Sequence, residues 1–85
     1  MKEFTYKICD EVGIHARPAG LLVKLAANFS SSVTLHKGSK SADAKKIFSV
    51  MALGAKKDDE VTVSICGSDE DTAFTELKSF FENNL

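Results

Sequence analysis

Four short stretches of the chain show the alternation of apolar and polar residues that is typical of strands. Residues 2–9 place every second side chain, Phe4 first, on one apolar face, and residues 60–66 repeat the pattern. A period of two predicts a strand with one buried face. Residues 33–37 and 40–44 are shorter strand candidates, and the Gly-Ser pair between them predicts that they form a hairpin.

Three other stretches carry apolar residues every three or four positions, the spacing of a helix with one buried face. The first begins around Pro18, which suits the first turn of a helix because no partner is needed for an N–H there. This helix should end near Asn28. A second, short helix is predicted over residues 46–53.

The third helix closes the chain. Ser68 is predicted to cap its start, and residues 69–71 place three acidic side chains in its first turn. Negative charge is favourable there because the N-terminal end of a helix dipole is positive. Residues 83–84 are predicted to be its frayed end.

The resulting order of elements is βαββαβα. Such an order predicts an α+β fold, an open-faced two-layer sandwich in which helices cover one face of a four-stranded antiparallel sheet. With no repeat, low-complexity segment or linker, we expect residues 1–85 to form one domain.

Composition narrows the classes of protein that the chain can represent. Of its 85 residues 44% are hydrophobic and 27% are charged, which is typical of a globular domain and excludes a disordered tail. No apolar run approaches the ~20 residues of a membrane-spanning helix, and we expect no membrane insertion. The first residues lack an apolar signal-peptide core. The two cysteines, Cys9 and Cys66, are interpreted as free thiols of a cytoplasmic protein without a metal site.

Charge is distributed unevenly although the net charge is only −1. Residues 12–57 contain eight basic residues and a single acid, Asp43, whereas residues 58–85 are mostly acidic among their charged positions. This asymmetry predicts a basic face that attracts an acidic partner, although the same residues could be solvated over several faces. A nucleic-acid binder is disfavoured because the net charge is negative and no aromatic recognition motif occurs.

One segment, Gly13-Ile14-His15-Ala16-Arg17-Pro18-Ala19, carries the chemistry. It places a histidine just before a helix whose first N–H groups, next to Ala16 and Pro18, form a ready anion site. Arg17 adds a planar guanidinium that can grip a phosphate, and a neutral imidazole is a good nucleophile near pH 7. The segment therefore suits reversible phosphoryl transfer through a phosphohistidine. The alternative is a histidine that only caps a helix.

The whole chain resembles HPr, the histidine-containing phosphocarrier family of the bacterial sugar phosphotransferase system. The segment 13–19 is similar to the family's active-site signature at every position. Residues 44–54, Ala-Lys-Lys-Ile-Phe-Ser-Val-Met-Ala-Leu-Gly, resemble the second family motif. Gly67-Ser68-Asp69-Glu70 resembles the entry to the family's last helix. Three motifs in the right order make the resemblance specific.

The resemblance implies a role for each residue of the signature. An HPr protein takes a phosphoryl group from phosphorylated enzyme I and passes it to the A domains of sugar-specific enzyme II. His15 would be phosphorylated on Nδ1, Arg17 would contact the phosphoryl group, and Pro18 would fix the start of the helix. The protein would be a stoichiometric carrier and not an enzyme, and it would need no metal or other cofactor.

The family also implies a docking surface beside the histidine. We expect the partner-binding residues to come from both predicted helices that flank it, namely Gly20, Leu21, Lys24, Lys45, Lys46, Ile47, Phe48 and Met51. The basic members, together with Arg17, would form a ring that steers acidic partners. Presenting one small face to several partners suits a monomer. A regulatory module of the same fold, binding transcription or metabolic regulators, is the alternative function.

One position departs from the family pattern. Many Gram-positive HPr proteins carry a regulatory serine in the second motif, and this chain has Lys46 there. We therefore expect the regulatory serine to be absent. Ser49 is a possible substitute, although an exposed helical serine without such a role is the simpler interpretation.

Overall fold

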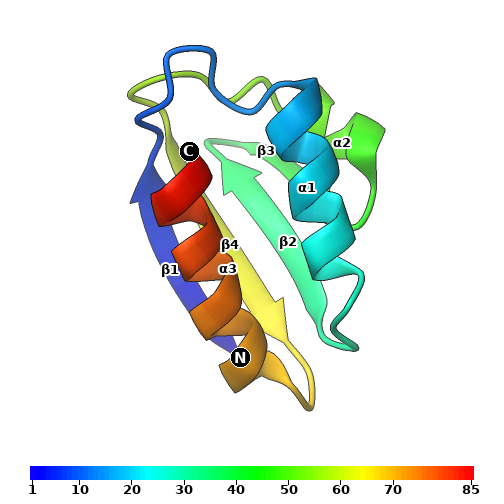
Figure 1. Cartoon of the computed structure of the whole chain (residues 1–85). Coiled ribbons are helices and arrows are strands. Elements are labelled where there is room, and N and C mark those ends of the chain that lie inside the picture. Colours follow the sequence, from blue (N-terminus) through cyan, green and yellow to red (C-terminus); the bar gives the residue numbers. More distant parts are fainter.

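A computed structural model describes residues 1–85 and contains four strands and three helices (Figure 1). Their bounds, in chain order, are β1 Lys2–Lys7, α1 Ala16–Ala26, β2 Ser32–Lys37, β3 Lys40–Asp43, α2 Ile47–Ala52, β4 Glu60–Cys66 and α3 Glu70–Asn84. The order of elements agrees with the prediction from apolar spacing.

The strands form one antiparallel sheet in the order β1-β4-β2-β3. Val63 on the central strand β4 lies opposite Phe4 of β1 and Leu35 of β2, so three apolar side chains share one face. Figure 1 shows α1 and α3 lying over one face of the sheet, with α2 beside α1. This is the predicted open-faced α+β sandwich.

The hydrophobic core lies between the sheet and the helices. Strand β4 alternates as its sequence predicts, with Val61, Val63 and Ile65 fully buried. Phe81 of α3 is fully buried, and its ring meets that of Phe4 edge to face with centroids 5.7 Å apart. Aromatic contacts of this geometry add to the energy of apolar burial. The packing fixes α3 against β1.

Two predictions about α3 are wrong. Its N-cap is Asp69 and not Ser68, whose hydroxyl instead lies 3.2 Å from that of Ser30. The helix also continues through Asn84, where fraying was expected. The Asn84 amide donates to the Phe80 carbonyl at 3.1 Å, and burial of Leu85 against the core holds the last turn in place.

Other features of the fold bear on the chemistry that the chain can carry. Cys9 and Cys66 are both free and exposed. No group of three or more His, Cys, Asp or Glu side chains is placed to hold a metal ion. No helix is both long and apolar enough to cross a bilayer.

Candidate functional site

The segment that carries His15 enters its helix through a close backbone contact at Gly13. This residue has φ of +80°, and a Cβ atom built on it would lie 2.2 Å from the Ala55 carbonyl oxygen. Only glycine combines that backbone conformation with that approach. The next N–H, of Ile14, donates to the same carbonyl at 3.0 Å. The loop before His15 is thereby fixed on the loop that follows α2.

That second loop is itself held by Lys37 of β2. The Lys37 ammonium donates to the Gly54 carbonyl at 2.9 Å and lies 3.2 Å from the Asp59 carboxylate. The same carboxylate accepts the backbone N–H of Lys56 at 2.9 Å. The Lys56 N–H, followed by Lys37, lowers the pKa of Asp59. Since these bonds anchor residues 54–59, they give the segment before His15 a rigid base.

His15 is the N-cap residue of α1. Its backbone is extended, with φ −106° and ψ −172°, and its side chain makes no capping hydrogen bond. The first intrahelical bond runs from the Ala19 N–H to the His15 carbonyl at 2.9 Å, so the N–H groups of Ala16 and Arg17 precede it. Such first-turn groups lack partners within a helix and can donate to an anion. With 43% of the His15 side chain exposed, a phosphoryl donor can reach the ring.

The ring opens on a cavity of about 250 Å³ that three parts of the chain enclose. Its lining residues are Asp10, His15, Arg17, Pro18, Leu21 and Asn84. The structure thus brings the predicted His15 and Arg17 together in one open site. A phosphoryl group on the ring would lie within a basic and hydrogen-bonding environment.

Sequence reasoning missed two of the residues that line this cavity. Asp10 belongs to the loop after β1, and its carboxylate lies 3.8 Å from Nε2 of His15. An aspartate three positions before a glycine with positive φ is a typical turn former, and that signal could have drawn attention to it. Asn84 gave no such signal, because only the unexpected length of α3 brings it to the site.

The predicted docking residues of α2 and α1 are largely accessible. Phe48 is 84% exposed, Leu21 45% and Met51 39%, and all three are large apolar side chains. Ile47 is partly buried, where α2 meets α1 near Gly20. Lys24 and Lys46 are exposed. Exposed aromatic and methionine side chains of this kind are typical of surfaces that bind proteins.

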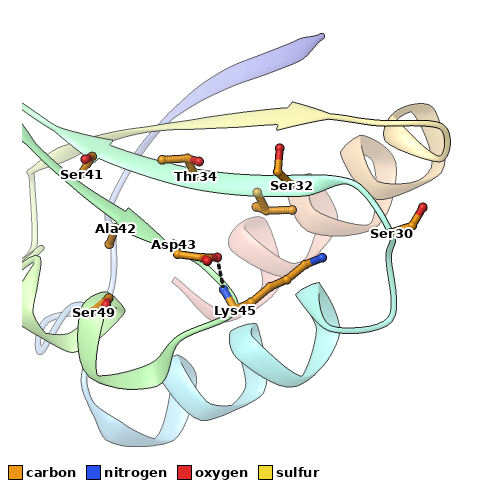
Figure 2. A pocket seen from close by; sticks show the side chains of 9 residues that line it. Ser30, Ser32, Thr34, Ser41, Ala42, Asp43, Lys45 and Ser49 are labelled. Carbon is orange, nitrogen blue, oxygen red and sulfur yellow. Dashed lines mark hydrogen bonds between the residues drawn. The ribbon is translucent and has the colours of Figure 1, made fainter.

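Lys45 lies apart from the His15 cavity. Its ammonium donates to the Phe29 carbonyl beyond the C-terminal end of α1 at 2.8 Å. Figure 2 shows it reaching along a second cavity, of about 450 Å³, next to several hydroxyl side chains of β2 and β3. Its backbone N–H donates to Asp43 at 2.9 Å. Lys45 was expected to belong to the basic ring, but its charge is turned toward the other end of α1.

Comparison with known proteins assigns the family. The model of a family described as "PTS HPr component phosphorylation site" matches residues 2–83, nearly the whole chain. The chain belongs to the HPr family. The matched range contains the HPr signature segment, residues 13–19.

Individual relatives agree with the HPr assignment. The phosphocarrier protein HPr of Mycoplasma capricolum is 41% identical over 78 residues, covering 92% of this chain and 88% of that protein. A crystal structure of HPr from Thermoanaerobacter tengcongensis superposes with a TM-score of 0.92 at 40% identity, covering 98% of this chain and 93% of the other. Crh, a catabolite repression protein of Bacillus subtilis, superposes at 0.78 with 34% identity, covering 94% and 92%.

Proposed function

We propose that this chain accepts a phosphoryl group on Nδ1 of His15 from phosphorylated enzyme I and passes it to enzyme II A domains. The observation that carries the proposal is an exposed histidine at the N-terminus of α1 that lines one open cavity together with Arg17. The first-turn N–H groups and the guanidinium would offset the charge of the phosphoryl group. Membership of the HPr family supports a carrier that is used stoichiometrically.

Docking is assigned to the apolar side chains beside this cavity. Leu21, Phe48 and Met51 are exposed and apolar, and Arg17, Lys24 and Lys46 supply positive charge. Such a surface fits an acidic partner with an apolar centre, bound by a monomeric carrier in the cytoplasm. Transfer should weaken as salt rises, because exposed charges are screened.

The proposed docking surface lacks the family's regulation by phosphorylation of a serine. Lys46 occupies the family's regulatory position and is the N-cap residue of α2. A lysine cannot accept a phosphoryl group as serine does, and its charge is opposite to that of phosphoserine. Ser49 remains the candidate substitute. Phosphorylation of the wild type by a serine kinase, lost in Ser49→Ala, would show that the switch has moved.

Likeness to Crh favours one alternative function, a regulatory module that binds transcription or metabolic regulators. The presence of both His15 and Arg17 in the cavity supports the carrier over a regulator without phosphoryl transfer.

The test is phosphorylation by enzyme I and phosphoenolpyruvate, followed by intact mass. The wild type should gain one acid-labile phosphoryl group, and His15→Ala should gain none. His36→Ala is the matched control, because His36 is the chain's other histidine and lies in β2. Labelling that persists in His15→Ala, or a folded wild type that takes no label, would contradict the proposal.

A further inference from the structure

Asp10 is held in place by contacts that do not involve His15. Its carboxylate oxygen Oδ2 accepts the N–H groups of Val12 and Gly13, each at 3.1 Å. Its backbone N–H donates to the backbone oxygen of Leu85 at 2.7 Å, which ties the turn to the end of α3. An aspartate that bonds the N–H two residues ahead forms a compact turn. The position of the carboxylate is therefore set before any ligand arrives.

The fixed carboxylate faces one particular nitrogen of the His15 ring. Oδ2 of Asp10 lies 3.8 Å from Nε2 of His15, and both side chains line the same cavity. This separation is longer than a hydrogen bond but lies within ion-pair reach. An ionised carboxylate only accepts hydrogen bonds, so it favours the form of the ring that carries its proton on Nε2. In that form the lone pair is on Nδ1.

We propose that Asp10 is a positioning residue for His15, which holds the ring proton on Nε2 and stabilises the positive charge that the ring gains when Nδ1 accepts a phosphoryl group. The proposal deepens the proposed function and rests on it. Asp10 would act as the buried aspartate of a serine protease triad does, which orients a histidine and stabilises its cation.

The transfer step shows why the charge matters. The Nδ1 lone pair forms a bond to phosphorus while the bond between phosphorus and the donor breaks, and the electron pair of that bond leaves with the donor. The proton on Nε2 stays on the ring, which becomes cationic. Arg17 in the same cavity is suited to the phosphoryl oxygens and cannot offset a ring cation. Asp10 supplies the one carboxylate among the residues that line the cavity.

The decisive variant is Asp10→Asn, because an asparagine oxygen still accepts the N–H groups of Val12 and Gly13 while the charge is lost. Glu11→Gln is the matched control, since it removes one negative charge from the neighbouring exposed residue. Two readouts are needed: ring ¹⁵N shifts of His15 at a pH where the ring is neutral, and the rate of phosphorylation by phosphoramidate. This small donor requires no partner protein, so a failure with enzyme I is distinguishable from a failure of the proposal.

We expect Asp10→Asn to lower the share of rings that carry the proton on Nε2. It should also slow phosphorylation roughly fivefold, the factor that attraction between unit charges at this separation gives in a water-like medium. Glu11→Gln should change neither readout. A wild-type result for Asp10→Asn in either readout would overturn the proposal. Equal effects of the two variants would do the same, because they would reflect overall charge and not the position of one carboxylate.

Discussion

Helices α1 and α3 begin at opposite ends of the sheet (Figure 1), and in each the side chain of the N-cap residue makes no capping hydrogen bond. At the start of α3, the Asp69 carboxylate accepts the N–H groups of Ser30 and Ser31, both at 2.9 Å, and the Ser31 hydroxyl. The Ser31 hydroxyl, followed by the Ser30 N–H, lowers the pKa of Asp69 to about 2. At the start of α1, the His15 ring makes no hydrogen bond and is 43% exposed.

The two helix starts differ in the role of the polar side chain: Asp69 stabilises the fold, whereas His15 stays available for chemistry. Ser31 is fully buried, and a Cβ built on Gly67 would lie 2.5 Å from the Cα of Ser31. The start of α3 is therefore tightly packed, and we call it the closed end. The start of α1, the open end, is held by the backbone around Gly13, and this leaves the His15 side chain without a hydrogen bond. A reactive group can therefore be well positioned without being hydrogen-bonded itself.

The largest effect on the difference between the two ends is expected for Gly13→Ala, at the open end. A side chain there must adopt a positive φ and displace the Ala55 carbonyl. We expect the free energy of unfolding to fall by about 3 kcal/mol or more, with loss of phosphoryl acceptance as well. Urea unfolding and intact mass after phosphorylation measure the two effects. Gly38→Ala is the control, because Gly38 also has a positive φ but has open space around it. Equal losses in both variants would show that only backbone strain matters.

A sharper separation of chemistry from folding is expected for Arg17→Ala. Losing a donor to the charge that develops in transfer should slow phosphoryl acceptance on the order of 100-fold. The side chain is exposed, so the free energy of unfolding should change by no more than about 0.5 kcal/mol. Rapid-quench phosphorylation gives the rate, with Lys40→Ala on the far hairpin as a charge control. An unchanged rate would remove Arg17 from the transfer step.

Docking should be separable from chemistry through Phe48→Ala. With 84% of the residue exposed, its removal should leave stability unchanged. The dissociation constant for enzyme I should rise about tenfold, as is common for a central aromatic contact. Titration calorimetry measures it. Val12→Ala is the control, an exposed apolar residue outside the predicted docking set. Similar weakening in both would indicate that apolar exposure in general, and not this position, drives binding.

The smallest effect is expected at the closed end, for Asp69→Asn. The pKa of Asp69 lies below its ordinary value of 3.8 at about 2, so ionised Asp69 stabilises the folded state fully above about pH 4. That contribution is lost as the pH falls toward 2. Asp69→Asn should thus lower the urea midpoint at pH 7 and differ less from the wild type at pH 2.5, with phosphoryl acceptance intact. Glu76→Gln, an exposed acid of the same helix, should show no such pH-dependent difference. A gap that stays constant between the two pH values would contradict the role of the ionised carboxylate.

The sequence predicts most of this fold because its local signals agree with one another. Alternation in β4 and the proline at the start of α1 place those elements correctly, since burial of one face controls both patterns. The cap of α3 was assigned to the wrong residue because a serine and an aspartate are equally good caps locally. Only the approach of the distant residues Ser30 and Ser31 decides how Asp69 is used.

The candidate site was predictable only where its residues lie close together in the sequence. His15 and Arg17 are contiguous with a helix start, and local spacing is enough to identify them. Asp10 and Asn84 come to the cavity through a turn and through the last turn of α3, which are set by tertiary contacts. Lys45 shows the converse, since its place in a motif suggested the basic ring while the Phe29 carbonyl draws its ammonium elsewhere.

The two free thiols allow the difference between the helix starts of α1 and α3 to be observed directly. Cys9 precedes Asp10 at the open end, and Cys66 precedes Gly67 at the closed end, and both are exposed. With the other cysteine replaced by serine, each can carry a single dye or spin label. A reporter on Cys9 would sense the arrival of a partner at His15, while one on Cys66 would sense opening of the contacts around Asp69. The chain thus contains one native labelling position for function and another for folding.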